Sequence, residues 1–103
     1  MYLEWYLREK EASQESLEEA VVRLLQEAHL TVTTAESCTG GLIAGTLVNV
    51  AGASDVLGEG YVTYSNEAKE RLVGVKGETL LQYGAASEQT AREMAEGAAR
   101  AAG

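Results

Sequence analysis

The stretch that decides the fold of this chain reads Thr33-Thr34-Ala35-Glu36-Ser37-Cys38-Thr39-Gly40-Gly41. It follows a β-branched run that starts at Leu30, and it leads into residues 42–48, where apolar side chains recur at helical spacing. The simplest local structure is a strand over residues 30–35, a tight turn of small residues, and a helix over about residues 39–50. Because this helix is mostly apolar, we expect it to be well buried.

The turn itself contains candidate chemistry, because Ser37 and Cys38 are both possible nucleophiles. A turn of this kind also presents backbone N–H groups at the positive end of a helix, where an anion or a developing oxyanion can be held. The competing interpretation is structural, since the hydroxyl groups of such a turn can simply cap the following helix. Spacing alone favours the structural interpretation.

The segment before this stretch predicts another helix. Ser16 and Glu19 have the spacing of a capping box. His29 ends the helix and is interpreted as a C-terminal capping residue rather than a catalytic one. The apolar residues between these ends have the spacing of one helix face: Leu17, Ala20, Val21, Leu24, Leu25 and Ala28.

The downstream half predicts a second strand and three more helices. The strand covers the aromatic and β-branched residues 61–64, after Gly58-Glu59-Gly60. A helix capped by Ser65-Asn66 follows over residues 67–73, and a short helix over residues 78–83 ends at Gly84. Ser87 caps the last helix, whose predicted packing face consists mainly of small residues: Ala91, Met94, Ala95, Ala98 and Ala102.

The order of these elements predicts an α/β fold with a mainly parallel sheet. Such a sheet is covered by helices on both faces, and two strands are too few to build it. The last helix reaches Gly103, where a further strand is expected. We therefore expect the sheet to be incomplete in this chain, with the remaining strands missing or supplied by another copy.

A second motif reads Gly60-Tyr61-Val62-Thr63-Tyr64-Ser65-Asn66-Glu67-Ala68-Lys69. It places Lys69 in the first turn of a helix, where the helix dipole and burial would favour a neutral amine suited to act as a general base. The alternative is an exposed lysine paired with a nearby Glu. Tyr64 either donates a hydrogen bond in a site or fills the core. Both motifs lie at the C-terminal ends of predicted strands, where open parallel sheets bind their ligands.

The composition excludes several classes of function. The 103 residues make one small domain, and 16 acidic against 8 basic residues give a net charge of −8, which argues against a nucleic-acid surface. A single cysteine excludes an intrachain disulfide, and one cysteine with one histidine offers no metal cluster. Neither a membrane span nor a signal peptide is visible, so we expect a cytoplasmic location.

The two motifs, residues 34–41 and 60–69, together closely resemble the C-terminal domain of the competence/damage-inducible CinA proteins. That family includes the stand-alone nicotinamide mononucleotide (NMN) deamidases. The similarity extends from about Ser16 to Gly103, and both motifs are long and specific. On this resemblance, residues 15–103 are the N-terminal portion of a CinA C-terminal-like domain, and residues 1–14 are a linker or docking segment.

The resemblance implies a three-layer α/β/α sandwich that hydrolyses the NMN carboxamide to nicotinate mononucleotide and ammonia, with no metal and no organic cofactor. By position, Ser37 matches the family's nucleophile, Lys69 its base and Tyr64 a tyrosine that lines the site. A Ser–Lys pair supplies both nucleophile and base without a histidine. The candidate substrate-binding residues surround Ser37: Glu36, Cys38, Thr39, Gly40 and Gly41.

The chain also departs from the family, whose domain continues past Gly103 with further strands and a glycine-rich segment that helps build the active site. Because an open sheet edge favours association with another chain, we expect a homo-oligomer. The expected ligand is a small-molecule nucleotide substrate, and we expect neither nucleic acid nor a membrane as a partner. The alternative to an NMN amidohydrolase is a non-catalytic nucleotide-binding or oligomerisation module of the CinA type. A third alternative is an interaction domain without a ligand, built on the aromatic N-terminus and the last helix.

Overall fold

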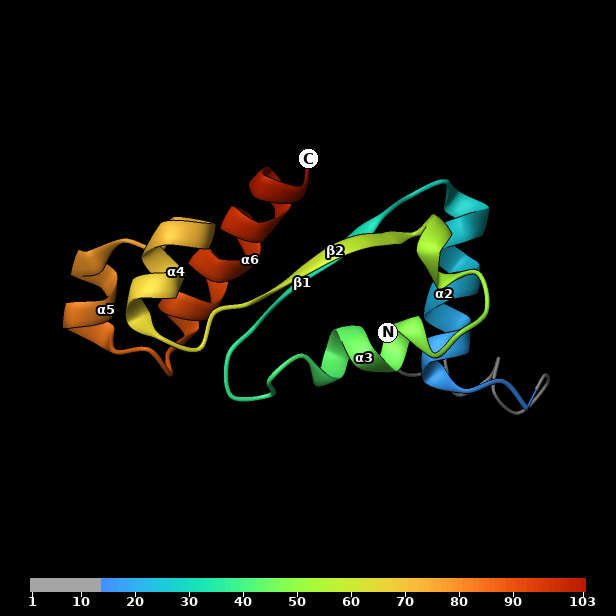
Figure 1. Cartoon of the computed structure of the whole chain (residues 1–103), viewed down its shortest axis with the longest axis horizontal. Helices are drawn as coiled ribbons and strands as arrows, with labels where there is room; N and C mark the ends of the chain where they lie inside the picture. The colour runs from blue at the N-terminus through green and yellow to red at the C-terminus, as the bar shows by residue number, and fades with distance from the viewer. Residues whose placement is uncertain (1–13) are drawn as a thin grey trace.

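The computed structural model describes residues 14–103 (Figure 1). The predicted linker or docking segment, residues 1–14, lies outside the described residues except for Gln14. None of the helices between residues 14 and 103 has the length and apolar character needed to cross a lipid bilayer. The elements are α2 (Leu17–Ala28), β1 (Val32–Glu36), α3 (Leu42–Val48), the 3-10 helix η1 (Ala53–Asp55), β2 (Leu57–Val62), α4 (Asn66–Val73), α5 (Gly77–Tyr83) and α6 (Glu88–Ala102).

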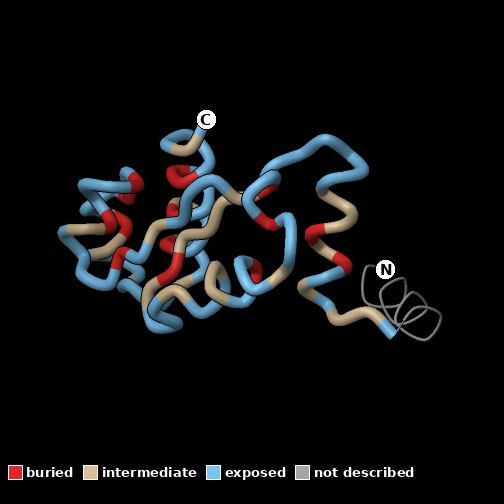
Figure 2. The backbone as a smooth tube through the Cα atoms, turned by 45° about the vertical axis from the view of Figure 1, so that its right-hand side comes forward, coloured by how far each residue is buried: buried red, intermediate tan, exposed pale blue. Residues whose placement is uncertain are grey.

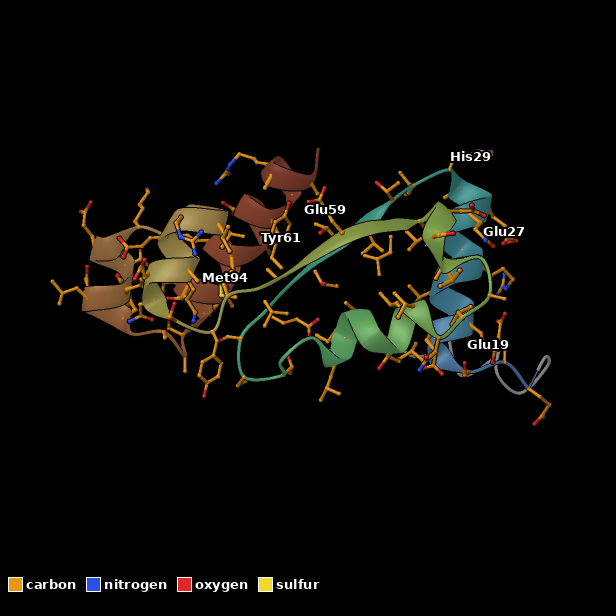
Figure 3. The ribbon with its side chains drawn as sticks, viewed as in Figure 1. Glu19, Glu27, His29, Glu59, Tyr61 and Met94 are labelled. Atoms are coloured by element: carbon orange, nitrogen blue, oxygen red, sulfur yellow. The ribbon has the colours of Figure 1, made fainter. Side chains whose placement is uncertain are left out.

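The two strands form a parallel pair with helices on both faces, which confirms the predicted α/β class. A Cβ atom added to Gly60 of β2 would lie 3.5 Å from the Cβ atom of Ala44, so α3 covers this face. The next residue, Tyr61, points the other way and packs against the cluster that contains Met94 of α6 (Figure 3). This alternation is the ordinary consequence of strand geometry.

The core consists of two separate clusters, one on each face of the sheet. The first cluster joins α2, α3 and η1 through Val22, Leu47, Ala53 and Val56. The second joins α4 and α6 through Val73, Val75, Met94 and Ala98. Figure 2 shows the result as short buried stretches that alternate with long exposed ones.

The helix ends follow local capping rules, as predicted. Ser16 Oγ accepts the N–H of Glu19 at 3.2 Å, and a Glu19 carboxylate oxygen accepts the N–H of Ser16 at 3.0 Å, which completes the capping box. At the starts of α4 and α6, Ser65 Oγ accepts the N–H of Ala68 and Ser87 Oγ accepts the N–H of Thr90. His29 is the C-terminal cap of α2, with a left-handed backbone (φ 56°).

The prediction that the helix after the central turn is well buried is wrong. In α3 only Leu47 is buried, whereas Leu42, Ile43 and Val48 are 70%, 52% and 59% exposed. The helix is also shorter than predicted, with seven residues. A helix this short buries only one narrow side, and most of its apolar side chains stay at least half exposed.

The second strand begins and ends earlier than predicted: Gly58-Glu59-Gly60, expected to precede it, belongs to β2, and Thr63 and Tyr64 follow it. Gly60 pairs with Thr34 of β1. A Cβ atom at Gly60 would lie 2.6 Å from Thr34 Oγ1, so this glycine permits a close approach inside the sheet.

The buried face of α6 is also turned relative to the prediction. Ala91 and Ala95 are exposed, and the buried residues are Thr90, Met94, Gly97 and Ala98. A Cβ atom at Gly97 would lie 1.6 Å from the carbonyl oxygen of Val73, so the α6 backbone contacts the end of α4 directly. The helix carries small residues on several of its faces, so its sequence does not specify which face is packed.

Candidate active site

Ser37 and Lys69 meet at one end of the sheet. Ser37 is the first residue after β1, and Lys69 lies in α4, the helix that follows β2. Because the strands are parallel, the segments that follow them emerge at the same edge. Lys69 Nζ lies 3.1 Å from Ser37 Oγ, which is hydrogen-bonding distance.

The Lys69 side chain is buried, with 1% of its surface exposed. Its amine donates to the carbonyl oxygen of Thr63 at 2.8 Å and to that of Tyr64 at 3.1 Å. Among residues 14–103 no carboxylate oxygen lies within 4.0 Å of this amine. The alternative of an exposed lysine paired with a Glu is therefore wrong.

The amine has three oxygen partners, because it also lies within hydrogen-bonding distance of Ser37 Oγ. A lysine amine that has released a proton can accept the proton of a hydroxyl at this distance. The geometry is therefore that of a nucleophile and an adjacent base.

Glu36 lies beneath the turn, with 3% of its surface exposed. One carboxylate oxygen accepts the Thr39 hydroxyl at 2.7 Å and the N–H of Ile43 at 2.9 Å, and the other accepts the N–H of Ala44 at 3.0 Å. Burial raises the pKa of this carboxyl, but the hydrogen bonds from Ala44, Ile43 and Thr39 together lower it and leave the pKa below its ordinary value. The predicted substrate-binding residue is thus placed as the cap of α3.

The turn between Ser37 and α3 requires its two glycines. Gly40 and Gly41 have φ values of 62° and 97°, in the left-handed region that other residues rarely adopt. The backbone N–H of Gly40 donates to the carbonyl oxygen of Ser37 at 3.0 Å and so closes the turn. The N–H groups of Cys38 and Thr39 have no partner within residues 14–103 and remain free to hold an oxyanion.

The remaining predicted site residues lie at the surface. Cys38 is an exposed free thiol beside Ser37. The Tyr64 side chain is 77% exposed, so the alternative that it fills the core is wrong. Sequence reasoning missed the role of the Thr63 and Tyr64 carbonyl oxygens as acceptors for Lys69. Every residue has a backbone carbonyl group, so residue types give no signal for these acceptors. Their position directly after β2 is the only feature of the sequence that could have indicated them.

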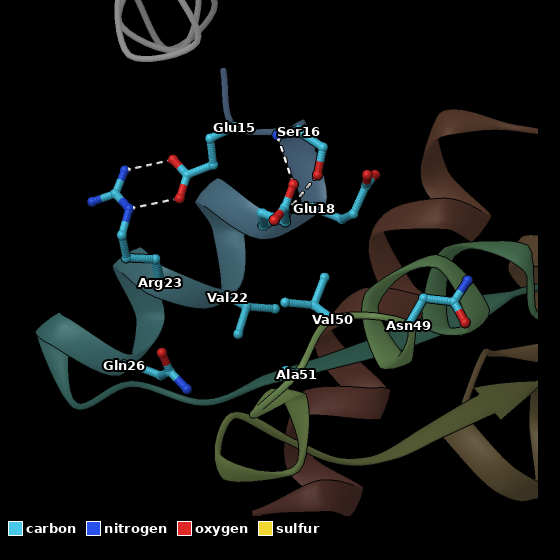
Figure 4. Close-up of a pocket in the computed structure, with 10 residues that line it drawn as sticks. Glu15, Ser16, Glu18, Val22, Arg23, Gln26, Asn49, Val50 and Ala51 are labelled. Carbon is cyan, nitrogen blue, oxygen red and sulfur yellow. Dashed lines mark hydrogen bonds and ion pairs between the residues drawn. The ribbon is translucent and has the colours of Figure 1, made fainter. Parts of the chain in front are cut away.

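A polar hollow of about 450 Å³ lies elsewhere, between α2 and the segment after α3 (Figure 4). Glu15 and Arg23 at its rim form an ion pair with a distance of 2.9 Å. The hollow shares no lining residue with the Ser37–Lys69 pair. We therefore assign the candidate chemistry to the end of the sheet and not to this hollow.

Known proteins match most of the chain. The family model of the CinA C-terminal domain matches residues 14–103. A CinA-like protein from Kosmotoga olearia is 61% identical over 90 residues, which are 87% of this chain and 22% of that protein. The chain thus spans about a fifth of the length of this curated relative.

Solved structures give the same result. The crystal structure of competence/damage inducible protein CihA from Agrobacterium tumefaciens matches with a TM-score of 0.80 and 50% identity, over 82% of this chain and 51% of that one. A CinA superfamily protein from Escherichia coli matches with a TM-score of 0.80 and 39% identity, over 82% of this chain and 49% of that one. The family match over residues 14–103 and these similarities show that the chain belongs to the CinA C-terminal domain family, as its two motifs indicated.

Proposed function

We propose that this chain carries the nucleophile and base of an amidohydrolase that converts NMN to nicotinate mononucleotide and ammonia. The observation that supports the proposal is the 3.1 Å contact between Ser37 Oγ and the buried amine of Lys69. The nicotinamide carboxamide as substrate rests on the family resemblance. Amide hydrolysis at neutral pH needs an activated nucleophile, and this pair supplies one.

In the first half-reaction, Ser37 Oγ attacks the carbonyl carbon of the carboxamide while Lys69 Nζ takes the hydroxyl proton. The carbonyl oxygen becomes an oxyanion, which the free N–H groups of Cys38 and Thr39 stabilise. When the intermediate collapses, the carbon–nitrogen bond breaks. The leaving nitrogen takes the proton from Lys69 and departs as ammonia, and the acyl group stays on Ser37.

In the second half-reaction, water attacks the acyl carbon and gives a proton to Lys69. The same backbone donors stabilise the second oxyanion. Its collapse breaks the bond to Ser37 Oγ, which recovers the proton from Lys69. NMN and water thereby give nicotinate mononucleotide and ammonia, and both side chains return to their starting states.

The position of Glu36 disfavours the alternative in which the glycine-rich turn holds a nucleotide phosphate. A phosphate at this helix end would use the first free N–H groups of α3. The Glu36 carboxylate already accepts those of Ile43 and Ala44, at 2.9 and 3.0 Å. A second anion there would be repelled by the buried negative charge of Glu36. We therefore favour a catalytic role for this turn over phosphate binding.

A second candidate function is self-association. An apolar hollow of about 530 Å³ lies between α2, β1 and α3. Leu17 and Ile43 line it and are 53% and 52% exposed. Exposed apolar surface beside an open strand edge favours association, which supports the oligomerisation alternative.

The experiment that tests the proposed function is ammonia release from NMN by the purified chain. Ser37→Ala and Lys69→Ala should abolish release, and Cys38→Ala should retain it, because the Cys38 thiol is not the proposed nucleophile. Circular dichroism checks that each variant remains folded. Full activity in both Ser37→Ala and Lys69→Ala would contradict the assignment. Thermal stabilisation by NMN without turnover would favour the binding module, since a ligand that binds the native state raises its stability.

A further inference from the structure

We propose that Glu36 is a positioning residue, which holds Ser37 Oγ against Lys69 Nζ from beneath the turn and contacts no substrate. The proposal rests on the proposed function only in that Ser37 is the nucleophile. It does not depend on which amide is hydrolysed. Glu36 is the last residue of β1 and immediately precedes Ser37, so any movement of its backbone moves the nucleophile.

The Glu36 side chain fixes the far end of the turn. Its carboxylate binds the Thr39 hydroxyl inside the turn and the N–H groups of Ile43 and Ala44 at the start of α3. These partners lie three, seven and eight positions away in the sequence. One buried group therefore ties the end of β1, the turn and the start of α3 together, with Ser37 between the tied points.

The Glu36 backbone fixes the support of the base. Its carbonyl oxygen accepts the N–H of Thr63 at 2.8 Å. The carbonyl oxygen of the same Thr63 accepts Lys69 Nζ at 2.8 Å. Glu36 is thus bonded to Ser37 along the chain and is connected to Lys69 through hydrogen bonds to Thr63. The positions of Ser37 and Lys69 therefore both depend on the position of Glu36 in the sheet.

The chemistry of the cap requires a carboxylate. A carboxylate presents only acceptors, and here it meets three donors. A glutamine would turn its NH₂ group toward at least one backbone N–H, which leaves a buried donor without an acceptor. The helices α2, α4 and α6 are capped by the serine directly before them, whereas the residue before α3 is Gly41, which has no side chain.

The test compares Glu36→Gln with Glu93→Gln. Glu93 is a matched control, because its carboxylate also caps a helix by accepting a backbone N–H, that of Lys76 at 2.9 Å, and a threonine hydroxyl, that of Thr79 at 2.6 Å. Both partners lie at the start of α5, and neither belongs to the Ser37–Lys69 site. Both variants therefore lose a carboxylate that accepts a backbone N–H and a threonine hydroxyl.

The probe is phenylmethylsulfonyl fluoride, which reports on the nucleophile without a nucleotide substrate. Ser37 Oγ bonds to sulfur, the sulfur–fluorine bond breaks, fluoride leaves and Lys69 takes the hydroxyl proton. Intact mass against time gives a rate constant and a final labelled fraction, with Ser37→Ala as the blank. With fresh probe added to replace what water hydrolyses, misplacement lowers the rate constant and leaves the final fraction complete, whereas partial unfolding lowers the final fraction.

We expect Glu36→Gln to lower the rate constant about tenfold or more, since small displacements of reacting groups have large effects on rate. Glu93→Gln should keep the wild-type rate constant. An unchanged rate constant in Glu36→Gln, an equal fall in Glu93→Gln, or no Ser37-dependent labelling of the wild type would each overturn the proposal. Glu36-sensitive labelling without ammonia release from NMN would support the positioning role and overturn the proposed function alone.

Discussion

The Ser37 hydroxyl lies 3.1 Å from the Lys69 amine, although 32 positions separate the two residues in the sequence. Parallel pairing of β1 with β2 produces this contact. Ser37 follows β1 and Lys69 lies in the helix that follows β2, and both segments begin at the same end of the sheet. The carbonyl oxygens of Thr63 and Tyr64, at the end of β2, hold the amine in place. The contact and its support therefore depend on the sheet.

Replacing Lys69 with Met tests the base while keeping a long side chain. We expect the rate of ammonia release from NMN to fall by about 10²–10⁴-fold, the usual effect of losing a general base. The fold should lose roughly 1–3 kcal/mol, because the buried carbonyl oxygen of Thr63 loses its donor. Lys76→Met is the control, since Lys76 is exposed. Equal rates in the two variants would remove Lys69 from the mechanism.

The Glu36 carboxyl predicts a loss of stability in acid. Burial raises its pKa, but the hydrogen bonds from Ala44, Ile43 and Thr39 together lower it and leave the pKa below its ordinary value. A carboxyl with a lowered folded pKa stabilises the fold above its unfolded pKa, and this contribution is lost as pH falls through the folded value. The urea midpoint should therefore fall as the pH drops below about 4.5, and less so in Glu36→Gln.

A pH series of urea unfolding curves measures this effect. Glu93→Gln should flatten a separate part of the dependence, because the Lys76 N–H and the Thr79 hydroxyl also hold the pKa of Glu93 below its ordinary value. Identical pH dependence in Glu36→Gln and the wild type would show that the buried cap contributes nothing to acid sensitivity.

Gly97→Ala tests the close approach of α6 to α4. Its Cβ atom would lie 1.6 Å from the Val73 carbonyl oxygen, so the helices must separate. We expect a loss of about 1–3 kcal/mol or more, as for overpacked cores. Gly45→Ala in α3 is the control, because its Cβ atom meets nothing within 4 Å. That change should be neutral or stabilise by about 0.5–1 kcal/mol, the propensity gain of alanine over glycine in a helix. Denaturant unfolding of both variants measures the difference.

Self-association is tested by Leu17→Asp, which places a charge in the apolar hollow between α2, β1 and α3. An acidic residue at the first position of α2 suits the helix dipole, so the fold should persist. We expect light scattering to show an oligomer for the wild type and a smaller species for Leu17→Asp. Leu81→Asp adds the same charge at a leucine that is 90% exposed on α5 and should leave the oligomer unchanged. A wild-type monomer at every concentration would contradict self-association.

Much of the candidate site could be predicted from residue types, and its geometry could not. Ser37 and Lys69 stand in two motifs at predicted strand ends, which pointed to a shared edge. Whether Lys69 was buried or paired with a Glu depended on packing against segments far away in the sequence. Glu36 is in the first motif, but the inward direction of its carboxylate is set by where α3 begins.

The sequence by itself determined the starts of α2, α4 and α6 and the α/β class. Caps act within three or four residues, so Ser16, Ser65 and Ser87 specify them without the rest of the fold. Tertiary structure decided which faces are buried, including the exposed side of α3 and the packed face of α6, because burial depends on which surfaces meet. It also decided the Ser37–Lys69 contact, since only the pairing of two parallel strands brings residues 32 positions apart to 3.1 Å.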